Sequence, residues 1–372
     1  MYKITLSLLL ALTLIACSPK SISQKDQSSQ KSKSARPHNV ILMIGDGMGL
    51  TQITAAMYMQ EEPLNLERFP IVGLHKSYSG DKLITDSAAG ATAFACGVKT
   101  YNGAIGVDMD TIPQITILEE AESNALSTGL IATSSIVHAT PASFIAHQPQ
   151  RKMYEAIAAD FLKTEIELFI GGGKKYFDRR ETDNRNLYEE LTNKGYLVSD
   201  YFKEDFSQFK AEPKKRIAYF TADKEPLQVE QGRDYLVPAT SLAIDFLDNF
   251  DEKGFFLMIE GSQIDWGGHA NSSNYIITEL HDFDKAIGKV LDFAAREKNT
   301  LVVITADHET GGYTITGGRR DSLVTQFTTG KHTPDLIPVF AYGPGAEAFS
   351  GIYENTAIYY KLRQVMGLAP KP

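Results

Sequence analysis

Four stretches of the chain are apolar at nearly every position, without the polar alternation that marks a strand with one exposed face. Such continuous runs predict strands that are buried on both faces of a sheet. They are NVILMI (residues 39–44), STGLIAT (127–133), GFFLMI (254–259) and NTLVVIT (299–305). Because segments with helical patterning lie between them, we expect an α/β fold: a three-layer sandwich with a largely parallel central sheet flanked by helices.

The clearest helix is predicted over residues 273–299, where apolar residues recur at intervals of three and four. This spacing places them on one face of a helix. The predicted inward positions are Ile276, Leu280, Phe283, Ile287, Val290 and Leu291, and the predicted outward positions are Asp282, Lys285 and Lys289. Residues 224–234 (KEPLQVEQGRD) lack this pattern, and we expect them to form an excursion at the surface.

The first residues have the features of an export signal, with a basic start at Lys3 and an apolar run too short to span a bilayer. The ending LIAC resembles the lipobox of bacterial lipoproteins, in which the cysteine, here Cys17, is acylated. A signal peptide cleaved without acylation is the alternative. Residues 18–37, rich in Ser, Lys and Gln, are predicted to be a disordered tether. Residues 38–372 are expected to form a single domain of an exported protein, lipid-anchored in the cell envelope, at the periplasm or outer membrane.

The composition is that of a globular protein, with 43% hydrophobic residues among 372 and a net charge of −9. This charge argues against nucleic acid or an anionic membrane surface as the main partner, because such partners favour basic patches. A small anionic substrate is not excluded. The chain has two cysteines, Cys17 and Cys96. If Cys17 is acylated, the mature chain has no disulfide, and we expect Cys96 to be a small buried residue.

Side chains capable of metal chemistry follow three of the predicted strands. Because the carboxyl ends of parallel strands lie at one edge of a sheet, these groups could meet there. A single acid after a strand is more often a helix cap or a turn former, but three such strands are harder to explain in that way. The residues are Asp46 after the first run, Glu260, Asp265 and His269 after the third, and Asp307 and His308 after the fourth.

The spacing of these residues indicates which of them could share a metal ion. Asp265 and His269 are four residues apart, which brings them to one face of a helix. Asp307 and His308 are adjacent, so both can reach one ion only where the backbone is irregular, and His332 could supply a further nitrogen. Mixed histidine and carboxylate sets suit zinc. An all-oxygen set suits magnesium, and such a set could be formed by Asp46, Thr140 and Glu260.

Two further segments contribute candidate residues. VHATPASFIAHQPQR (137–151) carries His138, Thr140 and Arg151, whose guanidinium fork would match two oxygens of a phosphate if an anion must be held. TDSAAGATA (85–93) has the pattern of a helix start, with Ser87 at the end where backbone N–H groups favour a phosphate. Its small residues would let this helix pack closely against a metal cluster. The remaining histidines are expected to be structural or at the surface: His38, His75, His147 and His281.

These motifs together resemble those of the alkaline phosphatase family, the metal-dependent phosphate monoesterases. The similar segments are GDGMG, DSAAGATA, HATPASFIAH, EGSQIDWGGHA and TADHETGG, in the order of the family. The resemblance extends from residue 39 to FAYGPGAEAF and covers nearly the whole mature chain. It implies hydrolysis of phosphate monoesters with a broad substrate range and an alkaline pH optimum, and a homodimer.

The resemblance also implies a role for each matching residue. Ser87 would be the nucleophile that becomes phosphorylated, and Arg151 would grip the phosphate. One zinc ion would be held by Asp265, His269 and His332, and the second by Asp46, Asp307 and His308. A magnesium ion would be held by Asp46, Thr140 and Glu260.

The chain departs from the enterobacterial pattern of the family, which has an aspartate in place of His138 and a lysine in place of Trp266. We expect His138 in the outer shell of the magnesium site, whereas Trp266 removes a positive charge near the phosphate. The interval from His308 to His332 is short compared with that of family members that insert a crown domain there. We therefore expect a reduced crown insertion in this chain.

Other functions remain open at this stage. A sulfatase would need a cysteine or serine in a C/S-x-P-x-R context, and Cys96 is followed by GVKT instead. A phosphodiesterase or another hydrolase of the wider superfamily is harder to exclude, because metal ligands alone do not fix the leaving group. A lipid-anchored protein that binds phosphate without turnover is a third alternative.

Overall fold

The computed structural model describes residues 37–251 and 253–368, which belong to one compact unit spanning Ala35–Pro372. The predicted signal peptide with its acylated Cys17 lies outside the described residues. Of the predicted tether only Pro37 is described, and it is buried. Within the described part of the chain, none of the helices combines the length and apolar character needed to cross a bilayer.

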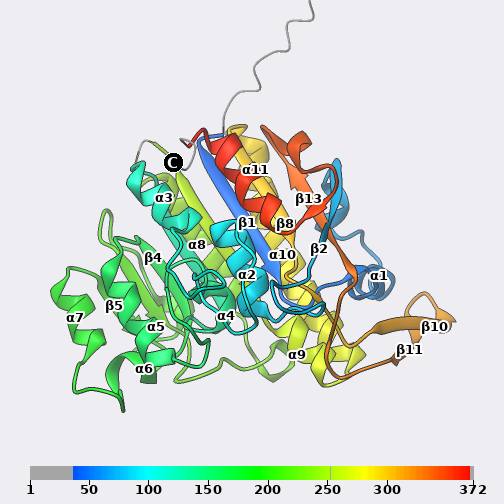
Figure 1. Cartoon of the computed structure of the whole chain (residues 1–372), viewed down its shortest axis with the longest axis horizontal. Coiled ribbons are helices and arrows are strands. Elements are labelled where there is room, and N and C mark those ends of the chain that lie inside the picture. Colours follow the sequence, from blue (N-terminus) through cyan, green and yellow to red (C-terminus); the bar gives the residue numbers. More distant parts are fainter. Residues whose placement is uncertain (1–36, 252, 369–372) are drawn as a thin grey trace, which may run out of the picture. The chain divides into compact units, whose positions relative to one another are not determined.

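A central ten-stranded sheet has the order β14-β2-β13-β8-β1-β7-β3-β4-β6-β5 (Figure 1). β13 pairs antiparallel with both β2 and β8, and the other pairs are parallel. The strands are β1 (Asn39–Gly45), β2 (Ile71–Lys76), β3 (Ser127–Ser135), β4 (Leu168–Gly172), β5 (Leu197–Asp200), β6 (Ile217–Phe220), β7 (Phe255–Gly261), β8 (Thr300–Thr305), β13 (Leu336–Tyr342) and β14 (Gly351–Glu354).

The four apolar runs of the sequence form β1, β3, β7 and β8, which are neighbours in the centre of the sheet. Every residue of these four strands is buried, because helices cover both faces. In β1, Leu42 and Ile44 pack into one core while Ile41 and Met43 pack into the other. The prediction of a largely parallel sheet inside a three-layer sandwich is confirmed.

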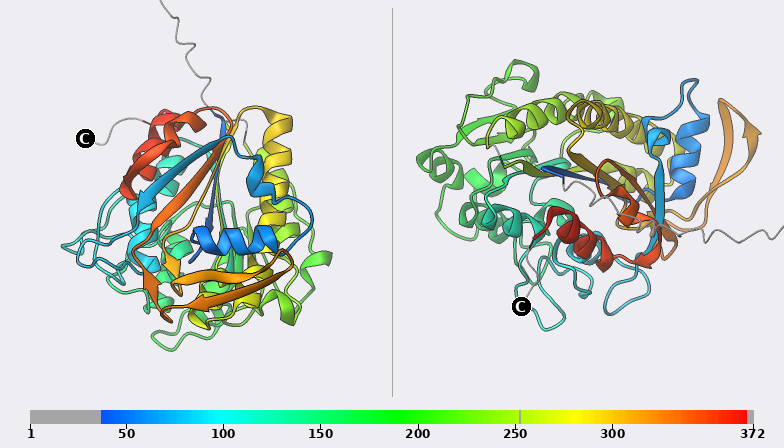
Figure 2. Two further views of the ribbon diagram at one scale, coloured as in Figure 1. Left: turned by 90° about the vertical axis from the view of Figure 1, so that its right-hand side faces the viewer. Right: turned by 90° about the horizontal axis from the view of Figure 1, so that it is seen from above.

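The helices form two layers on opposite sides of the sheet (Figure 2, right). One layer contains α2 (Ser87–Cys96), α3 (Ile117–Ser123), α4 (Ala139–Ala142), α5 (Tyr154–Asp160), α6 (Lys175–Asp178), α7 (Leu187–Asn193) and α11 (Thr356–Met366). The other contains α1 (Leu50–Tyr58), α8 (Leu236–Asp248), α9 (Gln263–His269) and α10 (Ser273–Glu297). The described 3-10 helices are η1 (Asn65–Arg68), η2 (Phe161–Lys163), η3 (Phe206–Gln208), η4 (Val229–Gln231) and η5 (Ala346–Phe349).

Helix α10 agrees with the predicted amphipathic pattern at all but one position. The six predicted inward residues are buried, and Lys285 and Lys289 are exposed. The prediction for Asp282 was wrong, because this residue is buried and accepts a hydrogen bond from Nη2 of Arg233 at 2.8 Å. Arg233 belongs to the predicted surface excursion, which is mostly exposed but turns this one guanidinium inward, 2.7 Å from Glu279 Oε2. A buried charge requires a partner of opposite charge, and the helical pattern could not reveal one supplied by a distant loop.

The segment between His308 and His332 holds β9 (Glu309–Thr310) and a hairpin of β10 (Tyr313–Arg319) and β11 (Ser322–Phe327). This hairpin projects from the sandwich at the lower right of Figure 1. β9 pairs with β12 (His332–Thr333) in a separate two-stranded sheet, with His332 opposite Thr310. The hairpin is therefore closed at its base, and His332 returns to the same region as His308.

Candidate metal centre

The carboxyl ends of the central strands bring together the side chains that the sequence singled out. Ile44 of β1 lies opposite Glu260 of β7 and Thr305 of β8, so these strands end at nearly the same level. The described residues contain three groups of ligand atoms spaced closely enough to share a metal ion. They are Asp265, His269 and His332; Asp46, Asp307 and His308; and Asp46, His138 and Glu260.

In the first group, two histidine nitrogens and a carboxylate converge. Nε2 of His332 lies 3.1 Å from Nε2 of His269 and 3.5 Å from Oδ1 of Asp265. The Nδ1 atom of His269 lies 2.8 Å from the carbonyl oxygen of Gly330, and that of His332 lies 2.9 Å from the carbonyl oxygen of Thr85. Because a carbonyl oxygen only accepts, both Nδ1 atoms carry the proton and both Nε2 lone pairs face each other. Two lone pairs at this separation are favourable only with a cation between them.

Asp265 and His269 are presented by α9, with His269 Nε2 at 3.4 Å from Asp265 Oδ2, as the four-residue spacing predicted. A close backbone approach holds this helix against the end of β1. Gly47 has φ +72°, and a Cβ at this residue would lie 2.7 Å from the Asp265 Cα atom. Glycine at position 47 is therefore required both by the backbone conformation and by space.

In the second group, several oxygens surround one ring nitrogen. Nε2 of His308 lies 3.2 Å from Oδ2 of Asp307 and 3.5 Å from Oδ1 of Asp46. All three side chains are fully buried. Burial lowers the pKa of His308 well below its usual value, so the ring is neutral. The Nε2 atom of this neutral ring lies among carboxylate oxygens, an arrangement suited to a divalent cation.

The third group and Thr140, the third predicted magnesium ligand, contain buried oxygens that lack hydrogen bonds. Oγ1 of Thr140, Oε1 of Glu260 and both Asp46 oxygens have no hydrogen-bond partner among the described residues. The other oxygen of Glu260 accepts hydrogen bonds from the hydroxyl groups of Ser262 and Ser134. Since buried polar groups are normally paired, several orphaned oxygens in one place fit an oxygen-liganded cation.

The pKa values of these carboxyl groups show how strongly the site favours positive charge. Burial, assisted by the nearby Asp307 carboxylate, raises the pKa of Glu260 to about 8, although a hydrogen bond from Ser262 opposes the shift. Burial also raises the pKa of Asp46 well above its usual value, again assisted by Asp307, and raises that of Asp307. A bound cation reverses this balance because it stabilises the ionised carboxylates. The donor set therefore fits metal ions at all three groups.

Ser87 is the first residue of α2, and it faces the second group. Its Oγ lies 3.4 Å from Nε2 of His308, a contact that the sequence did not predict. The helix start is confirmed, and its cap is Asp86, whose side chain accepts from the Ala89 N–H. The expected close packing is also found: a Cβ at Gly90 would lie 3.0 Å from Cβ of Asp307. The small residues after Ser87 thus allow α2 to lie directly against a metal-ligand residue.

Arg151 reaches the same region from the segment before α5. Its Nη1 donates to Oδ2 of Asp86 at 3.0 Å, and its Nη2 lies 3.3 Å from Nε2 of His138. A guanidinium only donates, so His138 Nε2 accepts and Nδ1 carries the ring proton. Trp266 packs edge-on against His138, with ring centroids 6.2 Å apart. His138 and Trp266, the two residues that depart from the enterobacterial pattern, therefore lie side by side, and His138 contacts Arg151.

Two important neighbours were missed by the sequence analysis. Asp86 lies in the predicted helix start, but its contact with Arg151 spans 65 positions and left no local signal. Thr310, in the TADHETGG segment, donates from its hydroxyl to Oδ1 of Asp265 and contacts His308. The remaining histidines lie outside the three groups, as expected: for example, His75 is buried and contacts the carbonyl oxygen of Ala306, and His147 contacts Glu119.

The fold and the site define a class: an α/β sandwich protein with several groups of metal-ligating side chains at the carboxyl edge of its sheet and a serine at a helix N-terminus beside them. The family model described as alkaline phosphatase matches residues 37–326. The chain belongs to the alkaline phosphatase family, the enzymes that hydrolyse phosphate monoesters.

Individual relatives agree with this assignment. The chain is 34% identical to alkaline phosphatase 3 of Bacillus subtilis (strain 168), over 89% of both chains. It is 31% identical to the alkaline phosphatase of Escherichia coli (strain K12), over 89% of this chain and 86% of the relative. The solved alkaline phosphatase of the Antarctic bacterium TAB5 superimposes with a TM-score of 0.86 and 44% identity, over 90% of this chain and 99% of that one.

Proposed function

We propose that this protein hydrolyses phosphate monoesters through a phosphoserine intermediate on Ser87, with two zinc ions and one magnesium ion. The observation that carries the proposal is the position of Ser87 Oγ, 3.4 Å from the His308 nitrogen that also faces Asp46 and Asp307. An oxygen at this position would share the second group's ion as a fourth ligand. The alcohol would leave in the first step, and water would cleave phosphoserine in the second.

The metal ions would be held by the residues that the sequence pattern selected. One zinc would be bound by Asp265, His269 and His332, the other by Asp46, Asp307 and His308, and magnesium by Asp46, Thr140 and Glu260. When bound, the ions supply charge that lowers the pKa of the Ser87 hydroxyl and stabilises the departing alcohol oxygen. The other groups around Ser87 have to position the phosphoryl group.

His138 would act in the outer shell of the magnesium site rather than as a ligand. Its contact with Arg151 supports this role, because a ring nitrogen that carries a proton cannot bind a metal ion. Magnesium also prefers oxygen ligands. Solved structures of two variants of the TAB5 enzyme, in which a histidine is replaced by aspartate or glutamate, contain bound magnesium. These structures support a magnesium site in a relative.

Arg151 would hold two non-bridging oxygens of the phosphoryl group. The Asp86 carboxylate fixes one side of the guanidinium. Burial by itself would lower the pKa of Arg151, but the pairing with Asp86 raises this pKa above its usual value, so the arginine stays charged. The N-terminus of α2 contributes further, since its free N–H groups favour an anion. Because these contacts all address the phosphoryl group, we expect a broad range of monoesters. An optimum at alkaline pH is expected from the family resemblance.

The protein would act as a homodimer at the cell envelope, anchored through lipid on Cys17. These features follow from the family resemblance and from the first residues of the sequence.

The decisive experiment measures hydrolysis of 4-nitrophenyl phosphate by the full chain across pH, before and after exhaustive chelation. We expect activity that rises toward alkaline pH, is lost on chelation and returns with zinc and magnesium. Ser87→Ala should lose hydrolysis but still bind inorganic phosphate. Activity that survives complete removal of metal would contradict the proposal, and equal rates on a phosphate diester would indicate a different hydrolase. Metal analysis tests the stoichiometry of two zinc ions and one magnesium ion.

A further inference from the structure

Two serine hydroxyl groups surround one oxygen of Glu260 at the carboxyl edge of the sheet. Oγ of Ser262 donates to Oε2 of Glu260 at 2.6 Å, and Oγ of Ser134 donates to the same oxygen at 3.3 Å. The two hydroxyl oxygens lie 3.0 Å apart. All three side chains are fully buried. Oε2 is therefore occupied by donors that the protein itself supplies.

The ends of two neighbouring strands hold these serines in place. Ala132 of β3 lies opposite Glu260 of β7, and Ser134 follows two residues later in β3. Ser262 comes directly after β7, at the start of α9, and its backbone N–H donates to Oγ1 of Thr133 at 2.8 Å. Both hydroxyl groups are thus positioned by the ends of β3 and β7.

The other oxygen of Glu260 is in a different situation. Oε1 is buried and has no hydrogen-bond partner among the described residues, and the same is true of Oγ1 of Thr140 and both oxygens of Asp46. The two oxygens of one carboxylate are therefore distinguished by their surroundings. Glu260 can offer Oε1 to a cation at no cost in hydrogen bonds, whereas offering Oε2 would displace two donors.

This difference bears on the choice between two divalent cations. Mg²⁺ is small and requires a nearly ideal octahedron of oxygens, to which a single oxygen of a carboxylate is well suited. Ca²⁺ is larger, takes more oxygens and often binds both oxygens of one carboxylate. A calcium ion that used both oxygens of Glu260 would leave buried hydroxyl groups without their acceptor, which is unfavourable.

We propose that Ser262 and Ser134 are positioning residues that make Glu260 a one-oxygen ligand, and that they thereby favour Mg²⁺ over Ca²⁺ at this site. The inference rests on the proposed function, which assigns magnesium to Asp46, Thr140 and Glu260. The alternative is a purely structural role, in which the hydroxyl groups only satisfy a buried carboxylate. Such a role predicts a loss of stability without a change in the preference between the two cations.

The test is a calorimetric titration of the full chain, with zinc already bound at the other two groups, with magnesium chloride and with calcium chloride. The measured quantity is the ratio of the Kd for Ca²⁺ to the Kd for Mg²⁺. Ser262→Ala should lower this ratio about tenfold, the usual order for a hydrogen bond to a charged group. Ser134→Ala should lower it about threefold, because its contact is longer. Ser262→Thr, which keeps the hydroxyl group, should keep the ratio of the unmodified chain.

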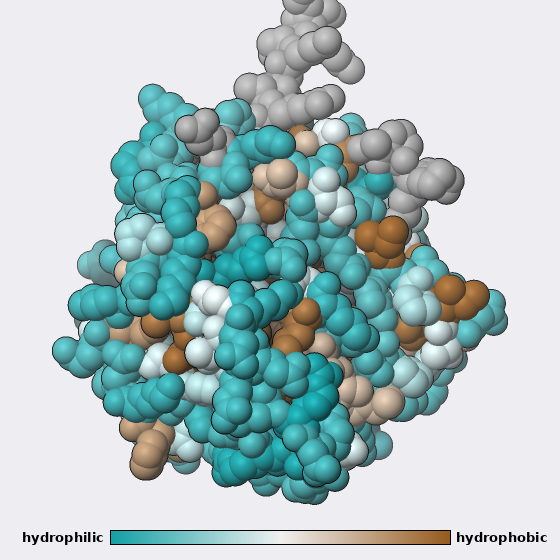
Figure 3. All heavy atoms as spheres, turned by 90° about the vertical axis from the view of Figure 1, so that its left-hand side faces the viewer, coloured by the Kyte–Doolittle hydropathy of each residue, from teal (hydrophilic) through white to brown (hydrophobic). Residues whose placement is uncertain are grey.

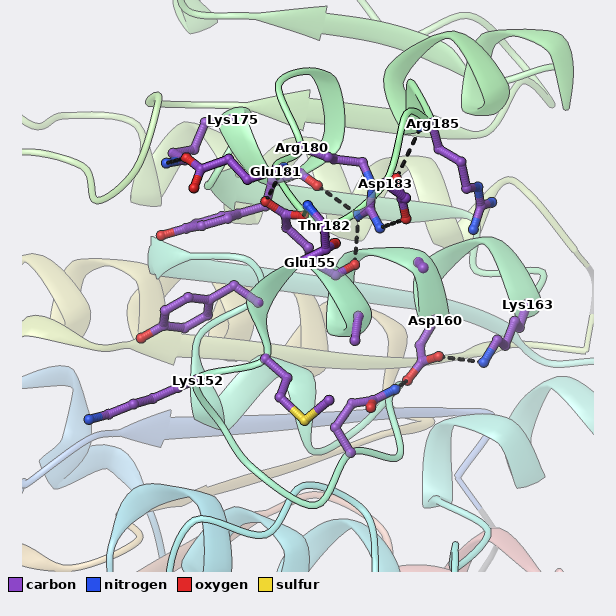
Figure 4. Close-up of a pocket in the computed structure, with 16 residues that line it drawn as sticks. Lys152, Glu155, Asp160, Lys163, Lys175, Arg180, Glu181, Thr182, Asp183 and Arg185 are labelled. Atoms are coloured by element: carbon purple, nitrogen blue, oxygen red, sulfur yellow. Dashed lines mark hydrogen bonds and ion pairs between the residues drawn. The ribbon is translucent and has the colours of Figure 1, made fainter.

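Thr182→Val is the matched control, because Thr182 also donates from its hydroxyl group to a glutamate. Its acceptor is Glu155, in the pocket between α5 and residues 175–185 (Figure 4). Neither residue belongs to a metal-ligand group. The side of the molecule that carries α6 and α7 is mostly hydrophilic, with apolar atoms in small, separate patches (Figure 3), and Thr182 is exposed. This variant should keep both its fold and the ratio of the unmodified chain.

The possible outcomes separate this inference from the proposed function. An unchanged ratio in both serine-to-alanine variants, or an equal fall in Thr182→Val, would overturn the inference and leave the magnesium site intact. If the unmodified chain binds no Mg²⁺, the magnesium site of the proposed function fails, and the inference fails with it. Should Ser262→Ala not fold, Ser134→Ala decides alone: a lower ratio supports the inference, and an unchanged one overturns it.

Discussion

The hydroxyl group of Thr310 donates a hydrogen bond to Oδ1 of Asp265 and lies 3.2 Å from Nδ1 of His308. One threonine therefore contacts a residue from each of two neighbouring metal-ligand groups. Because the hydroxyl hydrogen is used toward Asp265, its oxygen accepts from Nδ1–H of His308 and leaves Nε2 free for a metal ion.

Replacement of this threonine should weaken metal binding while preserving the fold. We expect Thr310→Val, which has nearly the same shape, to lower zinc affinity by a factor of about 10–100, the usual effect of losing such a supporting contact. Activity measured in zinc buffers should fall at limiting zinc and recover in excess. Thr310→Ser, which keeps the hydroxyl group, should behave like the unmodified protein. Identical zinc curves for the valine and serine variants would show that the contact is incidental.

Asp86 should control how firmly the site binds inorganic phosphate. Its Oδ1 accepts from the N–H groups of Ala89 and Gly103, and its Oδ2 holds Arg151. Asp86→Asn keeps the helix cap but removes the charge beside the guanidinium, so the inhibition constant of phosphate should rise about tenfold, as expected for a charge-assisted hydrogen bond of this kind.

The matched control for this variant is Asp292→Asn, which removes the partner of Arg68 in an exposed ion pair. It should leave phosphate inhibition unchanged. An inhibition constant that stays the same in Asp86→Asn would mean that Arg151 is positioned by other contacts.

Metal binding to the metal-free protein should release protons at pH 7. Burial raises the pKa of Glu260 to about 8, so this carboxyl group is mostly protonated before the metal binds, whereas a ligand must be ionised. We expect the release of at least about one proton per chain, measured by calorimetry in buffers of different ionisation enthalpy. Glu260→Gln should release about one proton fewer. Binding without net proton release would contradict the raised pKa.

The stability of the protein should fall as the pH rises from about 4.5 to 7. The cause is the carboxyl group of Glu167, which directly precedes β4 and belongs to none of the three metal-ligand groups. Burial raises the pKa of Glu167 from 4.5 to about 7. In this window the folded state keeps a proton that the unfolded state has released, so the stabilisation present below pH 4.5 is lost as pH rises through 7. Glu167→Gln still offers an oxygen to the N–H of Thr128, and this variant should not lose stability in this pH range.

From pH 4.5 to 8, the free energy of unfolding of the unmodified chain should fall by about 3 kcal/mol more than that of Glu167→Gln. Urea denaturation at saturating metal measures it. Glu165→Gln is the control, because Glu165 is exposed and its pKa is lowered rather than raised. A parallel pH dependence in the unmodified chain and Glu167→Gln would contradict the prediction.

The sequence by itself determined the central architecture. The continuous apolar runs of β1, β3, β7 and β8 require burial on both faces, and this requirement already implies two covering layers of helices. The acids and histidines directly after those strands also predicted the location of the site, because the ends of parallel strands share one edge. These features are local or follow from one general rule of sheet geometry.

Only the tertiary structure decided which side chains contact each other at the site. Ser87 and His308 are 221 positions apart, and His332 contacts the carbonyl oxygen of Thr85 across 247 positions. The pairing of Arg151 with Asp86 and the burial of Asp282 against Arg233 likewise join distant segments. The physical reason is that periodicity records only whether a residue faces the core or the solvent. The partner of a buried polar group depends on how loops and helices pack, which no single segment of the chain encodes.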